Sequence, residues 1–108
     1  MKVELFWWEG CPSHPEALEQ LKRVLTEEGI DPDSVQLVEI ESDEQAERES
    51  FFGSPTIRID GEDVVPPVEG QPVGLSCRVY RLRDGRPSAT PDVADMRHAI
   101  RRRAYAAR

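Results

Sequence analysis

Apolar and polar positions in the first 40 residues follow the patterns of a strand, a helix and a second strand. Residues 2–8 carry apolar side chains on both faces, which predicts a buried strand. From Ala17 to Leu25 the apolar residues recur at helical spacing, and Gly29 provides a natural helix end. Residues 35–40 predict a second strand. Because a helix links the two strands, we expect them to pair in parallel as a βαβ unit.

Capping residues predict where three helices begin. Ser13 offers an N-cap hydroxyl to the first helix, with Glu16 as its reciprocal partner in a capping box. Ser42 can cap a short charged helix over residues 43–49, and Asp92 can cap a C-terminal helix. The apolar stripe of that last helix consists of Val93, Met96, Ile100 and Ala104.

The remaining segments predict two more strands and a long loop. Residues 56–60 alternate and end in an Asp-Gly turn, which is typical of a strand and hairpin. Residues 66–76 contain three Pro and two Gly and predict a loop, whereas residues 77–82 alternate again and predict a fourth strand. The chain is therefore expected to form a single α/β domain over residues 1–108 with one mixed four-stranded sheet.

Composition narrows the class of protein. A chain of 108 residues with two Cys and two His has the size of one domain, and it lacks the cysteines of a disulfide-rich miniprotein or the ligands of a Cys/His zinc site. It contains no run of 18 apolar residues, and its first ten residues do not resemble a secretory signal. We therefore expect a cytoplasmic protein with no membrane partner and no bound metal.

The net charge of −7 is unevenly distributed. Residues 1–70 carry 5 Lys/Arg against 18 Asp/Glu, and residues 71–108 carry 9 against 3, which gives −13 and +6. One interpretation is that the two halves attract each other within one fold. The other is that the basic C-terminal helix binds an acidic partner. The total charge argues against a nucleic-acid partner. The basic residues in question are Arg97, Arg101, Arg102 and Arg103.

Cys11 is the strongest candidate for chemistry. It lies between the first strand and the start of the first helix, where unpaired N–H groups and the helix dipole favour a thiolate. His14 lies in the first helical turn, so that a protonated imidazole near the sulfur would stabilise the thiolate further. The alternative is that Cys11 is a small buried residue without chemical function.

Two motifs resemble the signatures of the thioredoxin superfamily. Residues 6–14 (FWWEGCPSH) resemble its active-site segment, and Ser54-Pro55-Thr56 resembles its second motif. The resemblance implies a thioredoxin-like βαβ-α-ββα three-layer sandwich that needs no cofactor. It also implies that Cys11 is the nucleophile and that Pro55 is cis and presents backbone to a disulfide substrate. Pro12, Ser54, Pro55 and Thr56 would contact this substrate.

The sequence departs from the family pattern at His14, which stands where the family usually has a resolving cysteine. Cys77 is the only other thiol of the chain, and it begins the predicted strand 77–82. It is either a resolving cysteine, a second soft-metal ligand or a buried strand residue. Bridging to Cys11 would require the two Cα atoms to lie within about 7 Å.

Three functions therefore remain open. The first is thiol–disulfide exchange on a protein or small-molecule thiol or disulfide, with Cys11 and His14 in catalytic roles and resolution by Cys77 or an external thiol. The second follows from a narrower resemblance of residues 9–12 and 74–80 to small bacterial thioredoxin-like proteins labelled as relatives of organomercurial lyase. It implies capture of a soft metal or organometal by the two thiolates. The third is a binding module that uses the Arg-rich C-terminal helix.

Overall fold

A four-stranded mixed sheet forms the centre of the structure. The structure, a computed structural model, describes residues 1–106. The strand order is β2-β1-β3-β4, with β1 (Val3–Trp7) parallel to β2 (Val35–Glu39). Strand β3 (Thr56–Ile59) runs antiparallel to β1, and β4 (Glu62–Asp63) antiparallel to β3. The predicted mixed four-stranded sheet and its parallel βαβ unit are confirmed.

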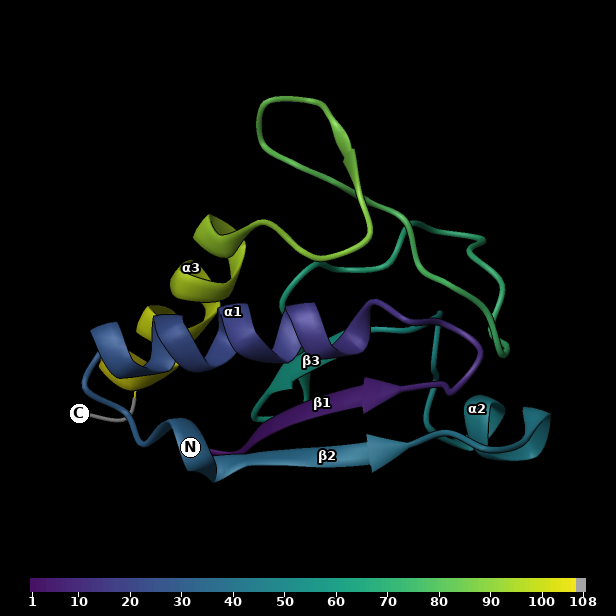
Figure 1. Cartoon of the computed structure of the whole chain (residues 1–108), viewed down its shortest axis with the longest axis horizontal. Coiled ribbons are helices and arrows are strands. Elements are labelled where there is room, and N and C mark those ends of the chain that lie inside the picture. Colours follow the sequence, from purple (N-terminus) through teal and green to yellow (C-terminus); the bar gives the residue numbers. More distant parts are fainter. Residues whose placement is uncertain (107–108) are drawn as a thin grey trace.

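Helices cover both faces of this sheet. Helix α1 (His14–Glu27) and helix α3 (Val93–Ala106) lie side by side on one face, as Figure 1 shows. The short helix α2 (Asp43–Arg48) packs against the other face, and a single 3-10 turn, Pro32–Ser34, leads into β2. The α/β class and the three expected helices are therefore confirmed.

The two faces of β1 carry two separate apolar cores, because successive side chains of a strand point in opposite directions. Val3 and Leu5 point towards α1 and α3. Phe6 points the other way, and its cluster is completed by Ile40, Ala46 and Phe51. The larger cluster also contains Ala17, Leu21, Val24, Leu25, Ile57, Ile59, Val64, Met96, Ala99 and Ile100. Because β1 is buried on both faces, its C-terminal end is fixed in the fold, and so is the position of the residues that follow it.

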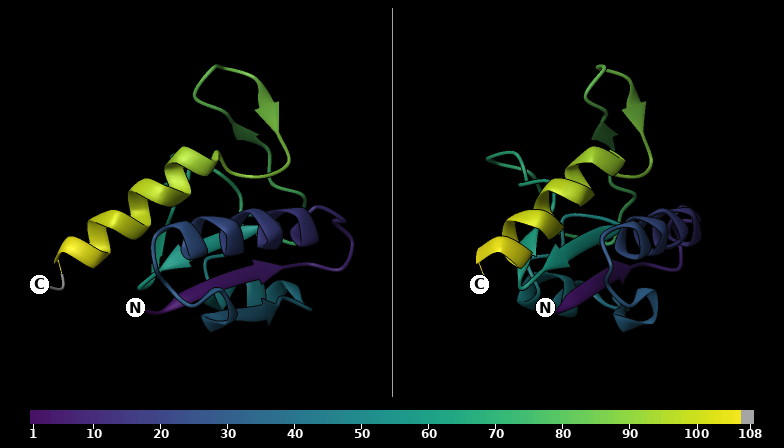
Figure 2. Two further views of the ribbon diagram at one scale, coloured as in Figure 1. Left: turned by 60° about the vertical axis from the view of Figure 1, so that its left-hand side comes forward. Right: turned by 90° about the vertical axis from the view of Figure 1, so that its left-hand side faces the viewer.

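The prediction that residues 77–82 form the fourth strand of the sheet is wrong. That position is taken by β4, which follows β3 through a two-residue turn at Asp60 and Gly61, where φ is +52° and +85°. Strand β5 (Tyr80–Arg81) pairs instead with β6 (Pro87–Ser88). This hairpin stands away from the main sheet (Figure 2). The short, acidic β4 gives no alternating signal, which is why the sequence pattern assigned its place to the later segment.

The capping predictions have mixed outcomes. Ser42 Oγ accepts a hydrogen bond from the backbone N–H of Gln45 at 3.1 Å, and Asp92 Oδ1 accepts one from Ala94 at 2.8 Å. The predicted capping box at Ser13 is wrong, because the Ser13 hydroxyl caps no N–H group of the described helix. Ser13 already has helical backbone angles, and its side chain turns towards Cys11.

The uneven charge distribution is resolved within the fold. The four arginines of α3 pair with acidic residues of the first 70, so the two halves of the chain attract each other as the first interpretation expected. The pairs are Arg97–Glu27 at 3.1 Å, Arg101–Glu28 at 2.7 Å, Arg102–Glu62 at 2.8 Å and Arg103–Glu62 at 2.7 Å. Over residues 1–106, none of the helices has both the length and the apolar character needed to cross a membrane.

Candidate active site

Cys11 lies in the turn between β1 and α1, where the sequence places it. Its backbone N–H donates to the carbonyl of Trp8 at 3.1 Å, which closes a tight turn before the helix. The residue is only 3% exposed. Its Sγ lies 3.3 Å from the hydroxyl of Ser13 and 3.5 Å from the carbonyl oxygen of Ser54. Cys11 therefore faces the segment that leads into β3.

Cys77 also lies beside Ser54, although it belongs to no regular strand. The backbone of residues 76–78 forms a parallel bridge with Ser54, in which the Ser54 N–H donates to the Ser76 carbonyl at 2.8 Å. The Arg78 N–H returns a hydrogen bond to the Ser54 carbonyl at 2.9 Å. Both cysteines are free thiols, and Cys77 is exposed. Its bridge to Ser54 brings it close to Cys11, whose Sγ lies 3.5 Å from the Ser54 carbonyl oxygen. The interpretation of Cys77 as a buried strand residue is wrong.

Arg78 anchors the segment that carries Cys77. Its guanidinium is buried and donates to Asp63 Oδ2 at 2.6 Å, to the Val65 carbonyl at 2.6 Å and to Thr56 Oγ1 at 3.3 Å. It also lies over the ring of Tyr80, 4.6 Å from the ring centroid. The positive charge of Arg78 therefore lies inside the fold against Asp63.

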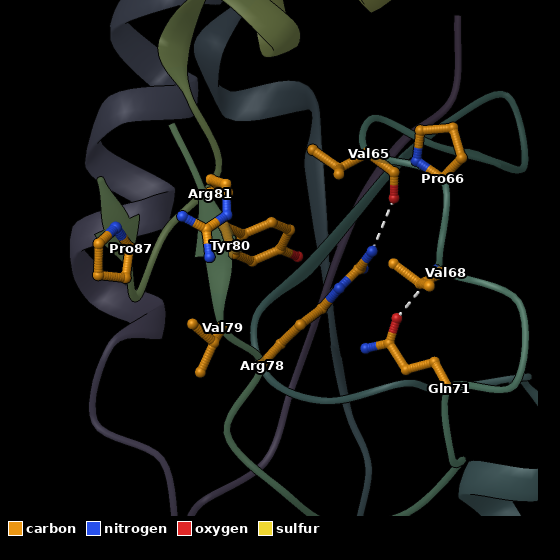
Figure 3. Close-up of a pocket in the computed structure, with 9 residues that line it drawn as sticks. All are labelled: Val65, Pro66, Val68, Gln71, Arg78, Val79, Tyr80, Arg81 and Pro87. Carbon is orange, nitrogen blue, oxygen red and sulfur yellow. Dashed lines mark hydrogen bonds between the residues drawn. The ribbon is translucent and has the colours of Figure 1, made fainter. Parts of the chain in front are cut away.

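Figure 3 shows Arg78 at one wall of a pocket of about 280 Å³. The pocket opens between the loop after β4 and the β5–β6 hairpin. Its lining residues are Val65, Pro66, Val68, Gln71, Arg78, Val79, Tyr80, Arg81 and Pro87. The dashed lines in Figure 3 mark how Arg78 reaches the Val65 carbonyl and how Val68 donates to Gln71, so hydrogen bonds fix both sides of the loop.

A glycine allows the two segments to approach closely. Gly53 has a φ of +127°, and a Cβ placed there would lie 2.9 Å from Cβ of Arg78 and 3.0 Å from its backbone nitrogen. Any other residue at this position would push residues 76–78 away from Ser54. The bridge between Ser54 and Cys77 therefore depends on glycine at position 53.

The motif Ser54-Pro55-Thr56 is buried throughout, and its Ser54–Pro55 peptide bond is cis. Thr56 Oγ1 donates to the Gly53 carbonyl at 2.7 Å, and the Tyr80 hydroxyl donates to the Pro55 carbonyl. Since Ser54 uses both backbone groups on residues 76 and 78, the motif is already bonded to its own chain. Pro12 is the one predicted substrate-contact residue that is exposed.

His14 does not take the position that the sequence analysis expected. Its ring stacks on Trp7 with centroids 4.3 Å apart and an interplanar angle of 19°. Within residues 1–106, its buried Nδ1 has no hydrogen-bond partner. The stacking covers one face of each ring and places the imidazole along the end of β1. Among residues 1–106, the imidazole forms no hydrogen bond with Cys11. Ser13, one residue earlier, contacts the sulfur instead.

The two thiols differ in their acidity. Burial raises the pKa of Cys11, but the hydrogen bonds from Cys77 and Ser13 outweigh burial and hold this pKa below the ordinary value of a thiol. The hydrogen bond to Cys11 raises the pKa of Cys77, and burial adds to this shift. The opposite directions of the two pKa shifts make Cys11 the more acidic of the two thiols.

Sequence reasoning did not identify the residues that hold the two cysteines together. Ser13 was assigned to a helix cap, and Tyr80 was assigned to a strand without any link to Pro55. The sequence does contain a signal that Arg78 points inwards together with Tyr80, because residues two positions apart lie on the same face of an alternating segment. No such signal indicates that Asp63 is its partner.

Comparison with family models, with curated proteins and with solved structures finds no match for this chain. Among residues 1–106, no group of three or more His, Cys, Asp or Glu side chains could hold a metal ion. What the site offers is two free cysteines that both contact Ser54, of which Cys11 is buried with a lowered pKa and Cys77 is exposed.

Proposed function

We propose that the protein is a thiol–disulfide oxidoreductase whose redox pair is Cys11 and Cys77. The observation that carries this proposal is that Ser54 contacts both cysteines, because its carbonyl oxygen lies 3.5 Å from Sγ of Cys11 and its backbone forms a bridge with Cys77. Two free cysteines that flank the same residue are candidates for a disulfide, and a lowered pKa is typical of reactive cysteines. In this proposal Cys77 supplies the second thiol that is missing at position 14.

The chemistry balances as an exchange of two electrons and two protons. The dithiol form and an external disulfide yield the Cys11–Cys77 disulfide and two external thiols, and the reverse reaction oxidises external thiols. Either direction passes through a mixed disulfide between one protein sulfur and the partner. No bound cofactor is required, because electrons and protons move between sulfur atoms.

The fold supports a thioredoxin-like interpretation of this site. The strand order β2-β1-β3-β4 and the three helices follow the order of elements expected from the resemblance, apart from the fourth strand. Cys11 at the start of α1 and the cis bond before Pro55 occupy the positions that the two motifs imply. Pro12 and the buried residues Ser54, Pro55 and Thr56 would then shape the surroundings of the reacting sulfur, and His14 would support the turn through Trp7.

Equilibration in a series of glutathione redox buffers, followed by acid quench, alkylation and mass spectrometry, tests the proposal. We expect a reversible intramolecular Cys11–Cys77 disulfide that appears in one transition and is absent from Cys11→Ser and Cys77→Ser variants. Two thiols that stay reduced across the whole series, or that form only separate glutathione adducts, would contradict the proposal.

A second candidate function rests on the same pair of sulfurs. Two adjacent thiolates are suitable ligands for a soft metal ion such as Hg²⁺ or Cu⁺. If this is the function, titration with Cu⁺ should give one tightly bound ion per chain, and loss of either cysteine should abolish tight binding. Binding of one ion that survives Cys77→Ser would exclude the paired site. The third candidate, a binding module built on α3, has less support because its arginines pair with Glu27, Glu28 and Glu62.

A further inference from the structure

We propose that Cys77, and not Cys11, is the sulfur at which external thiols and disulfides exchange with the site. This inference rests on the proposed redox pair and deepens it, because it assigns the point of contact with the substrate. It reverses the order expected from the resemblance, in which the cysteine at the helix start meets the substrate first.

The first argument is access. Cys11 is 3% exposed and its sulfur contacts Ser13 and Ser54, whereas Cys77 is an exposed residue. Thiol–disulfide exchange requires the external sulfur to reach the sulfur that it attacks. An external thiolate can therefore approach Cys77 directly, but it can reach Cys11 only if residues that bury Cys11 move.

The second argument is the occupied backbone of Ser54. An extended substrate could pair with Ser54 only through its N–H and its carbonyl, and both are bonded to Ser76 and Arg78 of the same chain. These bonds are supported by the buried guanidinium of Arg78, so the segment is held in place and is not a loosely attached loop. Residues 76–78 occupy the place of a bound strand, and Cys77 occupies the place of that strand's cysteine.

The chemistry of the pair agrees with this assignment. An external thiolate attacks Sγ of Cys77 in the disulfide form, the bond between the two protein sulfurs breaks, and Cys11 leaves as a thiolate that Ser13 stabilises. A second external thiolate then attacks the external sulfur of the mixed disulfide and releases Cys77, which takes up a proton from water. The two external thiols have been oxidised to a disulfide, and the protein pair has been reduced. A sulfur with a lowered pKa is the better leaving group, and this is Cys11.

The test compares the two single-cysteine variants, each of which contains one of the two sulfurs. Cys11→Ser and Cys77→Ser proteins are incubated with oxidised glutathione, and the addition of one glutathione is followed by mass spectrometry. We expect Cys77 in Cys11→Ser to react at least about tenfold faster than Cys11 in Cys77→Ser, because only the former is accessible. Equal rates, or faster reaction at Cys11, would overturn the inference.

Two controls separate this inference from the proposed function and from loss of folding. In urea, both variants should take up glutathione at similar rates, which shows that the native difference arises from the fold. In the wild type, the intramolecular disulfide reports on the redox pair alone. If that disulfide forms but the single-cysteine variants react equally, the pair stands and the assignment of Cys77 fails. If it does not form, the proposed function itself fails.

Discussion

The segments that carry Cys11 and Cys77 reach the same point of the molecule by different means. Cys11 follows a strand buried on both faces and precedes a long helix, so two regular elements fix its position. Cys77 lies outside the regular strands and is fixed by one backbone bridge and by the side-chain bonds of Arg78. The first half of the site is held by periodic secondary structure, and the second half by a few specific contacts.

This difference shows where the site is vulnerable. The position of Cys11 depends on many apolar contacts, each of modest energy, so that no single polar substitution should displace it. The position of Cys77 depends on Arg78, on the glycine at position 53 and on the bridge to Ser54. Substitutions at these few positions should separate the two sulfurs while α1 and the sheet remain folded.

The largest effect is expected from Arg78→Met. This change removes the buried partner of Asp63 together with the hydrogen bonds to Val65 and Thr56. Loss of one partner of such a pair should lower the free energy of unfolding by about 3 kcal/mol. It should also weaken formation of the Cys11–Cys77 disulfide, measured in glutathione buffers.

Arg81→Met is the matched control for Arg78→Met. Arg81 is exposed, and its guanidinium donates only to the Gly85 carbonyl in the described part of the chain. Its replacement should change the free energy of unfolding by less than about 1 kcal/mol and leave the disulfide unchanged. Similar losses in the two variants, followed by urea unfolding, would show that Arg78 is not the anchor.

A smaller effect is expected from Gly53→Ala. The added Cβ would lie 2.9 Å from Cβ of Arg78, and the φ of +127° is unfavourable for alanine. We expect a loss of about 1–3 kcal/mol in the free energy of unfolding, together with a weaker Cys11–Cys77 disulfide. Gly61→Ala is the control, since a Cβ at Gly61 would meet no described atom within 4 Å. It should cost about 1 kcal/mol from its positive φ alone and should leave the disulfide unaffected.

The smallest effect is expected from Ser13→Ala, which acts on Cys11 and not on Cys77. Loss of the hydroxyl should raise the pKa of Cys11, so its thiolate absorbance should appear at higher pH than in the wild type. Because one such hydrogen bond contributes about 0.5–1.5 kcal/mol and Cys11 is the leaving sulfur, its release from the disulfide by an external thiol at neutral pH should slow by up to roughly tenfold. In both proteins the thiolate absorbance should be lost as the pH falls through the pKa of Cys11, since the thiol form predominates below it.

Ser42→Ala is the control for Ser13→Ala. Ser42 caps α2 through Gln45, so its loss should cost about 1 kcal/mol of stability. It should leave the thiolate titration unchanged, because Ser42 belongs to a different helix. A shift of equal size in this variant would mean that the titration follows general stability and not the hydroxyl beside the sulfur.

The sequence predicted the half of the site that depends on periodicity. The apolar residues of β1 and the spacing from Ala17 to Leu25 defined the strand and the helix, and the position of Cys11 followed from them. The hairpin at Asp60 and Gly61 was also recognised from its turn residues, although its short returning strand was not.

The other half could not be predicted because it depends on contacts between residues far apart in the chain. Alternation over residues 77–82 was interpreted as a strand of the main sheet, but it reflects Arg78 and Tyr80 pointing inwards towards Asp63 and Pro55. The stacking of His14 on Trp7 was likewise not foreseen, because spacing alone does not show that β1 ends under the first turn of α1.

Because residues 76–78 are bonded to the backbone of Ser54, a strand from another molecule could pair with Ser54 only by displacing them. A strand on a short tether of the same chain is present at an effective concentration of roughly millimolar. A free peptide at micromolar concentration would therefore leave the internal strand in place. Since the effective concentration falls only as about the three-halves power of tether length, insertions in the 66–76 loop would change this competition gradually. The length of that loop sets how strongly the chain excludes foreign strands from Ser54.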